Sequence, residues 1–563
     1  MKSLLIGARL KVIFLSLIIV SLQSCASVPT PAPPVRSYDL VVLNARVVDG
    51  TGAPWFRGDV GVRGDTIVEI GDLSGASAAT VIDARDKVLS PGFIDLLGWD
   101  HGSVLVDPRL EGKIRQGVTS EATGEGNSPG PLSEAVVQER LAAARERNEP
   151  VWTTLGDFMR VVENRGTALN FAFFVGATNP RAMVLGQTNR QPTEDEMLQM
   201  EQIIDQAMRE GAIGLSTSLI YVPALYSTTE EIIRLAKVAR KYDGVYFSHI
   251  RDEGDVIESA LDEAFRIGEE ARIPVNIWHL KVSKPANWGK MPSVVERIEN
   301  ARRRGIDVAA NVYPYVASST GLTTRVPNWA LEGGYPAFRE RLSDPPTRLR
   351  IATEMLAIMN NLGGPARVLV SRIPNPDMSR FERKNVEEIA AMMGVDPVEA
   401  MLRLFEASPY SPSGIFFSMQ EDDLRHALRQ PWVSAGSDAG AVVGEAVKAG
   451  AHPRAYGTFP RIVGHYVRDA ELFSLEEAVR KLTSQAAARI QLQDRGILRV
   501  GMKADMIIFD PATIRDVSTY EDPHHFSEGI SDVIVNGVPV LRDGAMTGAL
   551  PGRVLRGRGW NRR

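Results

Sequence analysis

The chain has 563 residues, of which 44% are hydrophobic and 24% charged, so it can bury a large core and is not mainly disordered. Its 64 basic and 69 acidic residues give a formal net charge of −5. The chain therefore lacks the excess of positive charge that is typical of nucleic-acid-binding proteins. The single cysteine excludes an intrachain disulfide framework and any zinc site made of several cysteines.

The first residues are typical of a secretory signal, because basic residues precede an uncharged run, Val12 to Leu22, that is too short to span a bilayer. This run ends in LQSC, which resembles the bacterial lipobox. We therefore predict a lipoprotein signal peptide at residues 1–24, a lipid on Cys25 and a Pro-rich tether at residues 25–37. The alternative is a plain signal peptide cut near Ala26. The lipobox interpretation places the protein in the bacterial cell envelope, anchored to a membrane and facing the periplasm or the exterior.

Short strands are expected at both ends of the remaining chain. Residues 38–88 hold alternating β-branched runs separated by Gly-Asp and Asp-Gly turns, which predict a small antiparallel sheet. Residues 491–563 show the same kind of strands and turns and are expected to partner the first set.

Residues 89–490 alternate short apolar runs with helical stretches. The apolar runs are GFIDLL, GVTSEAT, NFAFFVGA, AIGLSTSL, GVYFSHI, PVNIWHL, DVAANVYP and WVSAGSD. Eight such runs predict an α/β fold with a (β/α) barrel. An insertion at about residues 326–430 separates the last two runs and is long enough to lie across the barrel mouth as a lid.

Polar residues that end these runs are the candidate site, because the carboxyl ends of barrel strands meet at one mouth. His249 and His279 end successive runs at equivalent positions, which suits a divalent metal ion. Asp438 ends the last run, where a carboxylate could take a proton from metal-activated water and pass it to a leaving amine. Either histidine alone also fits a hydrogen-bonded core residue, but the three together favour a catalytic site.

Longer motifs carry a resemblance to a known family. They are PGFID, SHIRDEG, WHLKVSKPANWGK, GSDAG, HPRAYGTFPRIVGHY, LTSQAAARI and GILRVGMKADMIIFD. Over residues 38–545 the chain resembles the amidohydrolase superfamily, and within it the N-acyl-D-amino-acid deacylases, or D-aminoacylases. The resemblance implies a metal-dependent TIM-like (β/α)8 barrel, a small β-sandwich built from both chain ends, and hydrolysis of linear amides with Zn²⁺ or another divalent metal.

The resemblance also implies roles for individual residues. His249 and His279 match metal-binding histidines, and Asp438 matches the catalytic aspartate. The positions that hold the substrate carboxylate or shape its pocket are Tyr221, Lys281, Ser318 and Arg454. Guanidinium, ammonium and hydroxyl donors are also what a carboxylate requires. The alternative for Lys281 and Arg454 is a structural ion pair.

Two departures from the family pattern affect the metal site. The family's His-x-His falls at Leu97 and Trp99, which cannot bind a metal, so we expect one ion rather than two. The family's cysteine ligand falls at Gly126, and the neighbouring Glu125 is the expected replacement, with Glu121 as the other candidate. Either carboxylate could instead be paired with a basic group.

The sequence thus predicts a lipid-anchored, single-metal hydrolase of N-acylated or peptide-like D-amino acids. A dipeptidase or cyclic-amide hydrolase on the same scaffold is the enzymatic alternative, and a non-catalytic ligand-binding protein of the envelope is the alternative from another class. The expected partners are a small N-acyl amino acid or peptide-like substrate and a membrane, without nucleic acid. The acyl group, the side-chain preference, the D or L selectivity and the oligomeric state remain open.

Overall fold

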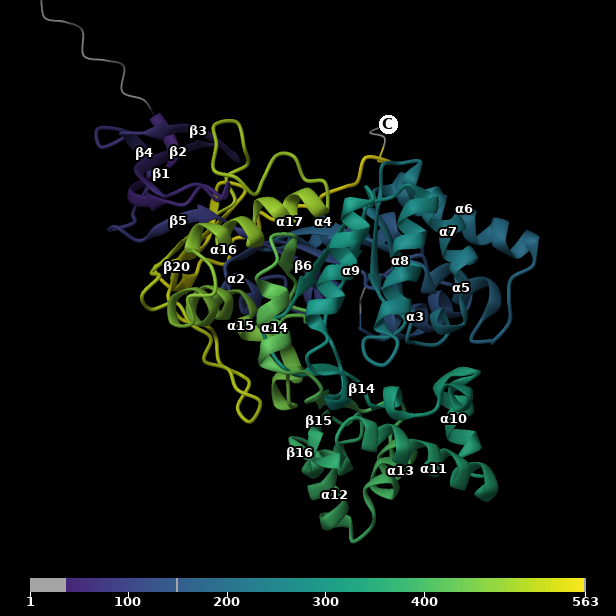
Figure 1. The fold of residues 1–563 in the computed structure, drawn as a ribbon. Helices are drawn as coiled ribbons and strands as arrows, with labels where there is room; N and C mark the ends of the chain where they lie inside the picture. The colour runs from purple at the N-terminus through teal and green to yellow at the C-terminus, as the bar shows by residue number, and fades with distance from the viewer. Residues whose placement is uncertain (1–36, 148–149, 561–563) are drawn as a thin grey trace, which may run out of the picture.

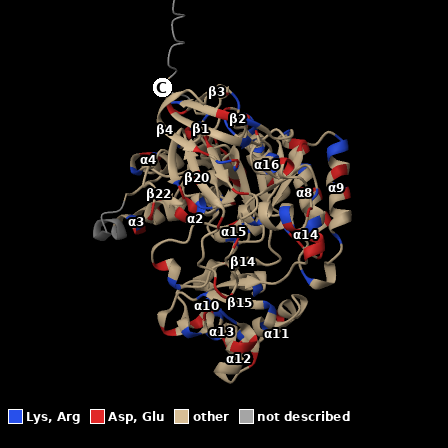
Figure 2. Cartoon of the chain, turned by 90° about the vertical axis from the view of Figure 1, so that its left-hand side faces the viewer, with Lys and Arg blue, Asp and Glu red and all other residues tan. Residues whose placement is uncertain are grey.

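The computed structural model describes residues 37–147 and 150–560 (Figure 1). The predicted signal peptide, Cys25 and the tether up to residue 36 lie outside the described residues. Within the described ranges, no helix is both long enough and apolar enough to cross a membrane. In the view of Figure 2, acidic and basic residues are interspersed along the chain, for example in α8 (Ile257–Ala271), α9 (Met291–Arg303) and α14 (Glu421–Leu428).

A barrel of parallel strands forms the centre of the molecule. In chain order the strands are β6 (Phe93–Gly98), β7 (Val118–Thr123), β8 (Asn170–Phe173) with its continuation β9 (Val175–Gly176), β10 (Gly214–Ser218), β11 (Val245–His249), β12 (Val275–Ile277), β13 (Val308–Val312) and β18 (Val433–Ala435). Strands β6 to β8 pair in parallel, as do β9 to β13 and β18. A parallel bridge from Gly98 to Ala439 links the first strand to the segment after the last. The predicted barrel is confirmed, and each predicted apolar run supplies one strand.

Helices lie outside the barrel and between its strands in the chain. Besides α8, α9 and α14, they are α1 (Asp100–Val106), α2 (Glu111–Ile114), α3 (Glu134–Arg147), α4 (Leu155–Arg165), α5 (Thr178–Leu185), α6 (Glu194–Glu210), α7 (Thr229–Arg240), α15 (Arg454–Arg461), a π-helix (Ile462–Asp469), α16 (Leu475–Leu482) and α17 (Ser484–Arg489). Short 3-10 turns span Ala224–Tyr226, Pro285–Asn287, Leu322–Arg325, Asn328–Leu331, Pro365–Arg367, Pro376–Phe381 and Gly444–Lys448.

Helix α6 shows how the sequence sets these boundaries. Thr193 caps its first turn by accepting a hydrogen bond from the amide of Glu196, whose side chain bonds back to the cap. Gly211 ends the helix with φ at 116°, a value that L side chains rarely adopt. The apolar face that packs inward consists of Met197, Met200, Ile204, Ala207 and Met208.

Both ends of the chain contribute to one further sheet. Its strands are β1 (Ser37–Val47), β2 (Phe56–Arg63), β3 (Thr66–Gly71), β4 (Ser77–Asp83), β5 (Val88–Pro91), β19 (Met506–Phe509), β20 (Ile530–Val535), β21 (Val538–Arg542) and β22 (Ala545–Met546). Strand β19 pairs antiparallel with β5, which joins the two ends of the chain. Val42 and Val60 from one end pack with Ile508 and Ile534 from the other. The predicted composite β-domain is confirmed. Its N-terminal part is a mixed sheet rather than the antiparallel one predicted, because β4 and β5 both pair in parallel with β1.

The insertion forms a separate lobe beside the barrel, with an apolar core of its own (Figure 1). It contains β14 (Ser318–Gly321), β15 (Val368–Arg372), β16 (Lys384–Asn385), β17 (Ser413–Phe416), α10 (Gly334–Arg341), α11 (Pro345–Asn361), α12 (Val386–Met393) and α13 (Pro397–Ala407). Strand β14 pairs antiparallel with β17, so the sheet of this lobe already includes Ser318. Helix α14 packs on α9 and β13 of the barrel.

Candidate metal centre and active site

Three buried side chains converge where barrel strands end. Glu125 follows β7, His249 ends β11 and His279 follows β12. Their ligand atoms lie within 4.8 Å of one another. Glu125 Oε1 is 2.8 Å from His249 Nδ1 and 3.2 Å from His279 Nε2. One carboxylate and two imidazoles are an ordinary donor set for a catalytic zinc ion, which needs an open position as well.

The backbone beside Glu125 leaves no room for a side chain at the cysteine position of the family pattern. A Cβ atom on Gly126 would lie 2.5 Å from Ser218 Oγ, and the backbone there has φ at 63°, so a side chain at this position would be strained and would collide with β10. Glu125, one residue earlier, places a carboxylate oxygen beside the two histidines. Ser218 Oγ lies 3.4 Å from Glu125 Oε1 and donates to it.

The charges of this group favour cation binding. Burial alone would raise the pKa of Glu125, but hydrogen bonds to His249 and His279 hold it well below its usual range. Burial and the ammonium of Lys281 act to lower the pKa of His279, but Glu253 and Glu125 outweigh them and raise it to about 9. His249 Nε2 is buried without a hydrogen-bond partner. The residues therefore fit a divalent ion, whose charge would replace the proton on His279.

A second carboxylate, Glu253, lies behind the histidines and was not predicted. Its Oε1 is 3.0 Å from His279 Nδ1 and it is ion-paired with Lys281. Burial would raise the pKa of Glu253, but Lys281 and the two histidines hold it well below its usual range. A carboxylate in this place fixes the ring of a metal-binding histidine. The motif SHIRDEG, with an acid four residues after His249, was the available sequence signal.

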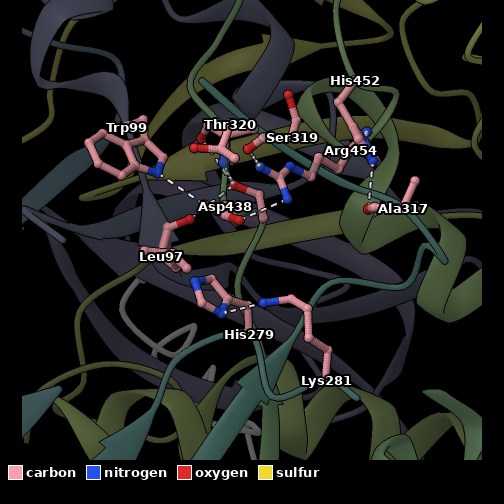
Figure 3. A network of polar contacts seen from close by, with 12 residues as sticks. Leu97, Trp99, His279, Lys281, Ala317, Ser319, Thr320, Asp438, His452 and Arg454 are labelled. Atoms are coloured by element: carbon pink, nitrogen blue, oxygen red, sulfur yellow. Dashed lines mark hydrogen bonds and ion pairs between the residues drawn. The ribbon is translucent and has the colours of Figure 1, made fainter. Parts of the chain in front are cut away.

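Asp438 is held by several groups (Figure 3). Its carboxylate accepts the indole N–H of Trp99 at Oδ1, over 3.1 Å, and is ion-paired at Oδ2 with Arg454 Nη1, over 2.8 Å. Its amide donates to Leu97 O, over 2.7 Å. Asp438 has φ at 51° and His279 has φ at 37°. Left-handed backbone at two non-glycine residues is strain of the kind that surrounding contacts maintain at functional sites.

A buried ammonium secures the segment that carries Asp438. Lys113 Nζ lies 2.6 Å from Asp95 Oδ2, 3.3 Å from Glu121 Oε2 and 3.6 Å from Asp100 Oδ2. It also donates to Ser437 Oγ and to the carbonyl of Ala439, each over 2.8 Å. Burial would lower the pKa of Lys113, but these carboxylates raise it above its usual value.

Glu121, the other ligand candidate, belongs to this Lys113 cluster rather than to the metal group. Its Oε1 accepts the amide N–H of Asp100 over 3.0 Å. Burial, and then the charge of Asp100, raise its pKa well above the usual range. Among the described residues, the group able to hold a metal contains Glu125 and does not contain Glu121.

The predicted substrate-binding residues surround the metal group. The ring of Tyr221 is 5.5 Å from that of His249, and its hydroxyl is 2.8 Å from Thr320 Oγ1 on β14. Arg454 Nη2 donates to Ser319 O, over 3.2 Å. Ser318 is half-buried at the start of β14. The insertion thus meets the barrel mouth through β14, and the neighbours of Ser318 make the contacts to Tyr221 and Arg454.

Tyr221 lies between the metal group and Asp438 in electrostatic terms. Burial raises the pKa of Tyr221, and the charges of Glu125, Asp438 and Glu253 raise it further, so this phenol lies within electrostatic reach of all three. Lys281 and Arg454 are both buried and are already paired, with Glu253 and Asp438 respectively.

A further cation at the barrel mouth is the guanidinium of Arg325. Arg325 stacks on Phe416, 4.7 Å from the ring centre, and donates from Nε to Thr324 Oγ1 over 3.3 Å. Burial lowers its pKa to about 10, and the group with which it interacts electrostatically is Tyr221. No acidic partner of Arg325 occurs among the described residues. Its guanidinium is therefore available to an anion.

A parallel barrel with a carboxylate–histidine–histidine group and an aspartate after its last strand defines a metal-dependent hydrolase. The model of the amidohydrolase family (Amidohydro_3) matches residues 80–541. The chain belongs to this family. It is 37% identical to a D-aminoacylase of Alcaligenes xylosoxydans xylosoxydans, over 92% of this chain and 98% of that protein.

Two solved structures are also similar to this chain over almost its whole length. An N-acyl-D-glutamate deacylase from Bordetella bronchiseptica, complexed with zinc and a phosphonate mimic of the tetrahedral intermediate, is 30% identical, with a TM-score of 0.78 over 93% of this chain and 100% of that one. A D-aminoacylase, studied for one-metal activation and second-metal attenuation in its binuclear centre, is 36% identical, with a TM-score of 0.77 over 92% and 100% of the two chains.

Proposed function

We propose that this protein is a zinc-dependent deacylase of N-acyl-D-amino acids or related peptide-like substrates. The buried group of Glu125, His249 and His279 is the observation that carries the proposal. Similarity along almost the whole chain to a D-aminoacylase and an N-acyl-D-glutamate deacylase supports the reaction and the substrate class.

The metal-binding residues and Asp438 divide the chemistry between them. Glu125, His249 and His279 would hold the ion, which when bound supplies a Lewis acid for the amide carbonyl. Nδ1 of His279 lies 3.0 Å from Glu253 Oε1 and 2.7 Å from Lys281 Nζ, so Nε2 is the ring nitrogen left to face the site of the ion.

Asp438 moves the proton. Its carboxylate takes a proton from the attacking water as the new C–O bond forms, and returns it to the amide nitrogen as the C–N bond breaks. Trp99 donates a hydrogen bond to Oδ1 and Arg454 forms an ion pair at Oδ2, so the carboxylate is fixed and keeps lone pairs for this transfer. The products are a free carboxylic acid and a free amino acid.

Arg325 is assigned to the substrate carboxylate. Lys281 and Arg454 already neutralise Glu253 and Asp438, whereas Arg325 has no acidic partner among the described residues and lies beside Tyr221. A guanidinium with no internal anion gains most from binding a substrate anion. Arg325→Met should raise KM by about 10- to 100-fold, as for loss of a charge-assisted hydrogen bond, with a smaller change in kcat. An unchanged KM would return the role to Lys281 and Arg454.

Hydrolysis of paired enantiomers tests the function. The zinc-loaded protein is assayed against N-acetyl-D-amino acids and their L-enantiomers, with release of the free amino acid as the readout and Asp438→Asn as the control. Preferential release from the D series is expected. Hydrolysis of dipeptides or cyclic amides alone would favour the alternative enzymes, and a protein with neither metal nor hydrolysis would be a ligand-binding protein.

We also propose that the protein is a lipid-anchored component of the bacterial cell envelope. The support is the LQSC sequence, which ends an apolar run, and the Pro-rich segment that separates Cys25 from β1. Cys25→Ser should release the protein from membranes and abolish labelling by a radioactive fatty acid. A variant that fractionates and labels as the wild type does would contradict this anchor.

A further inference from the structure

Trp99 stands where the family pattern has a histidine ligand, and the structure gives its indole a different task. Its N–H points at Asp438 Oδ1, over 3.1 Å (Figure 3). The backbone amide of Trp99 also donates to Ala439 O, over 3.2 Å, so the tryptophan is fixed against the segment that carries Asp438. Both the indole and the main chain of this residue therefore contact one short segment.

The indole N–H can only donate a hydrogen bond, so Trp99 offers no lone pair to a metal ion. The side chain of Leu97, at the other histidine position, has no donor or acceptor atom and is fully buried. Asp438 Oδ2 is already paired with Arg454 Nη1, over 2.8 Å. Asp438 thus has a hydrogen-bond donor at Oδ1 and an ion pair at Oδ2, and the donor occupies the position of a histidine ligand of the family pattern.

We propose that Trp99 is a positioning residue, whose indole N–H orients the carboxylate of Asp438 from a position that holds a histidine ligand in the family pattern. The chain then needs one ion for catalysis, and Asp438 stays free to carry the proton. The kinetic consequence rests on the proposed hydrolase function, whereas the hydrogen bond itself does not.

The hydrogen bond is tested on the full-length, zinc-loaded protein labelled with ¹⁵N-tryptophan. The chain has 8 tryptophans, so its indole N–H spectrum is simple. Trp99→Phe identifies one signal by its loss. That signal should move more than any other indole signal in Asp438→Asn, because the charged acceptor has become neutral. A Trp99 signal that does not move in Asp438→Asn would overturn the proposal.

The catalytic role is tested by kinetics. Trp99→Phe keeps an aromatic ring but removes the N–H, so kcat should fall by about 10- to 100-fold while KM stays within about threefold and one zinc per chain is retained. Trp329→Phe is a matched control, because it removes an indole N–H that bonds a carboxylate, Glu354 Oε2 at 2.9 Å, within the insertion. This control should keep the wild-type kcat.

The outcomes separate the two proposals. A wild type that hydrolyses none of the amides contradicts the proposed function, and the spectrum still decides whether Trp99 orients Asp438. An active wild type with an unchanged kcat in Trp99→Phe contradicts the positioning role. Equal losses of kcat in Trp99→Phe and Trp329→Phe would show a general effect of tryptophan removal and would also contradict it.

Discussion

Removing the ammonium of Lys113 should destabilise the barrel more than removing a partly exposed lysine of the same kind. Lys113 Nζ contacts Asp95, Glu121 and Asp100 at 2.6, 3.3 and 3.6 Å, and all four side chains have no exposed surface. In Lys113→Met these acids would be buried without their cation, and breaking a buried pair in this way costs about 3–5 kcal/mol. That is a large part of the stability of an ordinary protein, about 5–15 kcal/mol.

Amide hydrogen exchange followed by mass spectrometry measures this loss where it occurs. In peptides covering β6 and β18, exchange through local opening should accelerate by about 10² to 10⁴, the equivalent of that free energy. Lys503→Met is the control, because Lys503 pairs with Asp65 at 2.9 Å with side chains 26% and 22% exposed, and such a pair contributes about 1 kcal/mol or less.

The effect of Lys113→Met should depend on pH in a defined direction. Burial already raises the pKa of Glu121 well above its usual range, and without the ammonium that pKa rises further. A carboxylate with a raised pKa in the folded state stabilises the fold at low pH and destabilises it as the pH rises. The variant should therefore be closer to the wild type at pH 5 than at pH 8. Equal exchange rates in Lys113→Met and Lys503→Met at pH 8 would refute this reasoning.

Three further predictions concern the site. Glu125→Gln removes the carboxylate that both imidazoles face and should weaken zinc binding, measured against a chelator, by more than about 100-fold; unchanged affinity would exclude Glu125 as a ligand. Asp438→Asn should lower kcat by about 10² to 10⁴ without loss of the bound metal. If this variant kept wild-type turnover, Asp438 would have no part in the mechanism. If it lost the metal, Asp438 would be a metal ligand. Because the pKa of His279 is raised to about 9 without metal, an ion must displace a proton below that pH, so zinc affinity should rise by about tenfold per pH unit from 7 to 9; an affinity independent of pH would contradict this.

The barrel was predictable because its strands are short apolar runs that end in polar residues. His249 and His279 belong to such runs, and their positions at successive strand ends bring them together in space. Glu125 was predictable as the carboxylate beside the missing cysteine. The collision of a Cβ atom on Gly126 with Ser218 supplies a reason that the sequence could not show, since the two residues meet only in the folded barrel.

Other parts of the site were not predictable from the pattern. Lys281 and Arg454 have the charge that a substrate carboxylate needs, but the sequence did not show that Glu253 and Asp438 already pair with them. Arg325 lies in the insertion, whose fold brings it to the mouth through the short turn after β14. Trp99 was predicted only as a residue unable to bind metal, because its hydrogen bond joins residues 339 positions apart in the chain.

Titration of the metal-free protein with zinc tests the central claim most directly. Glu125, His249 and His279 form one group able to hold a metal ion, and Trp99, at a histidine position of the family pattern, donates a hydrogen bond to Asp438. Deacylase activity should therefore rise linearly up to one equivalent of zinc per chain and stay constant with further additions. Activity that needs two equivalents, that falls as a second ion binds, or that is complete without metal would contradict the account.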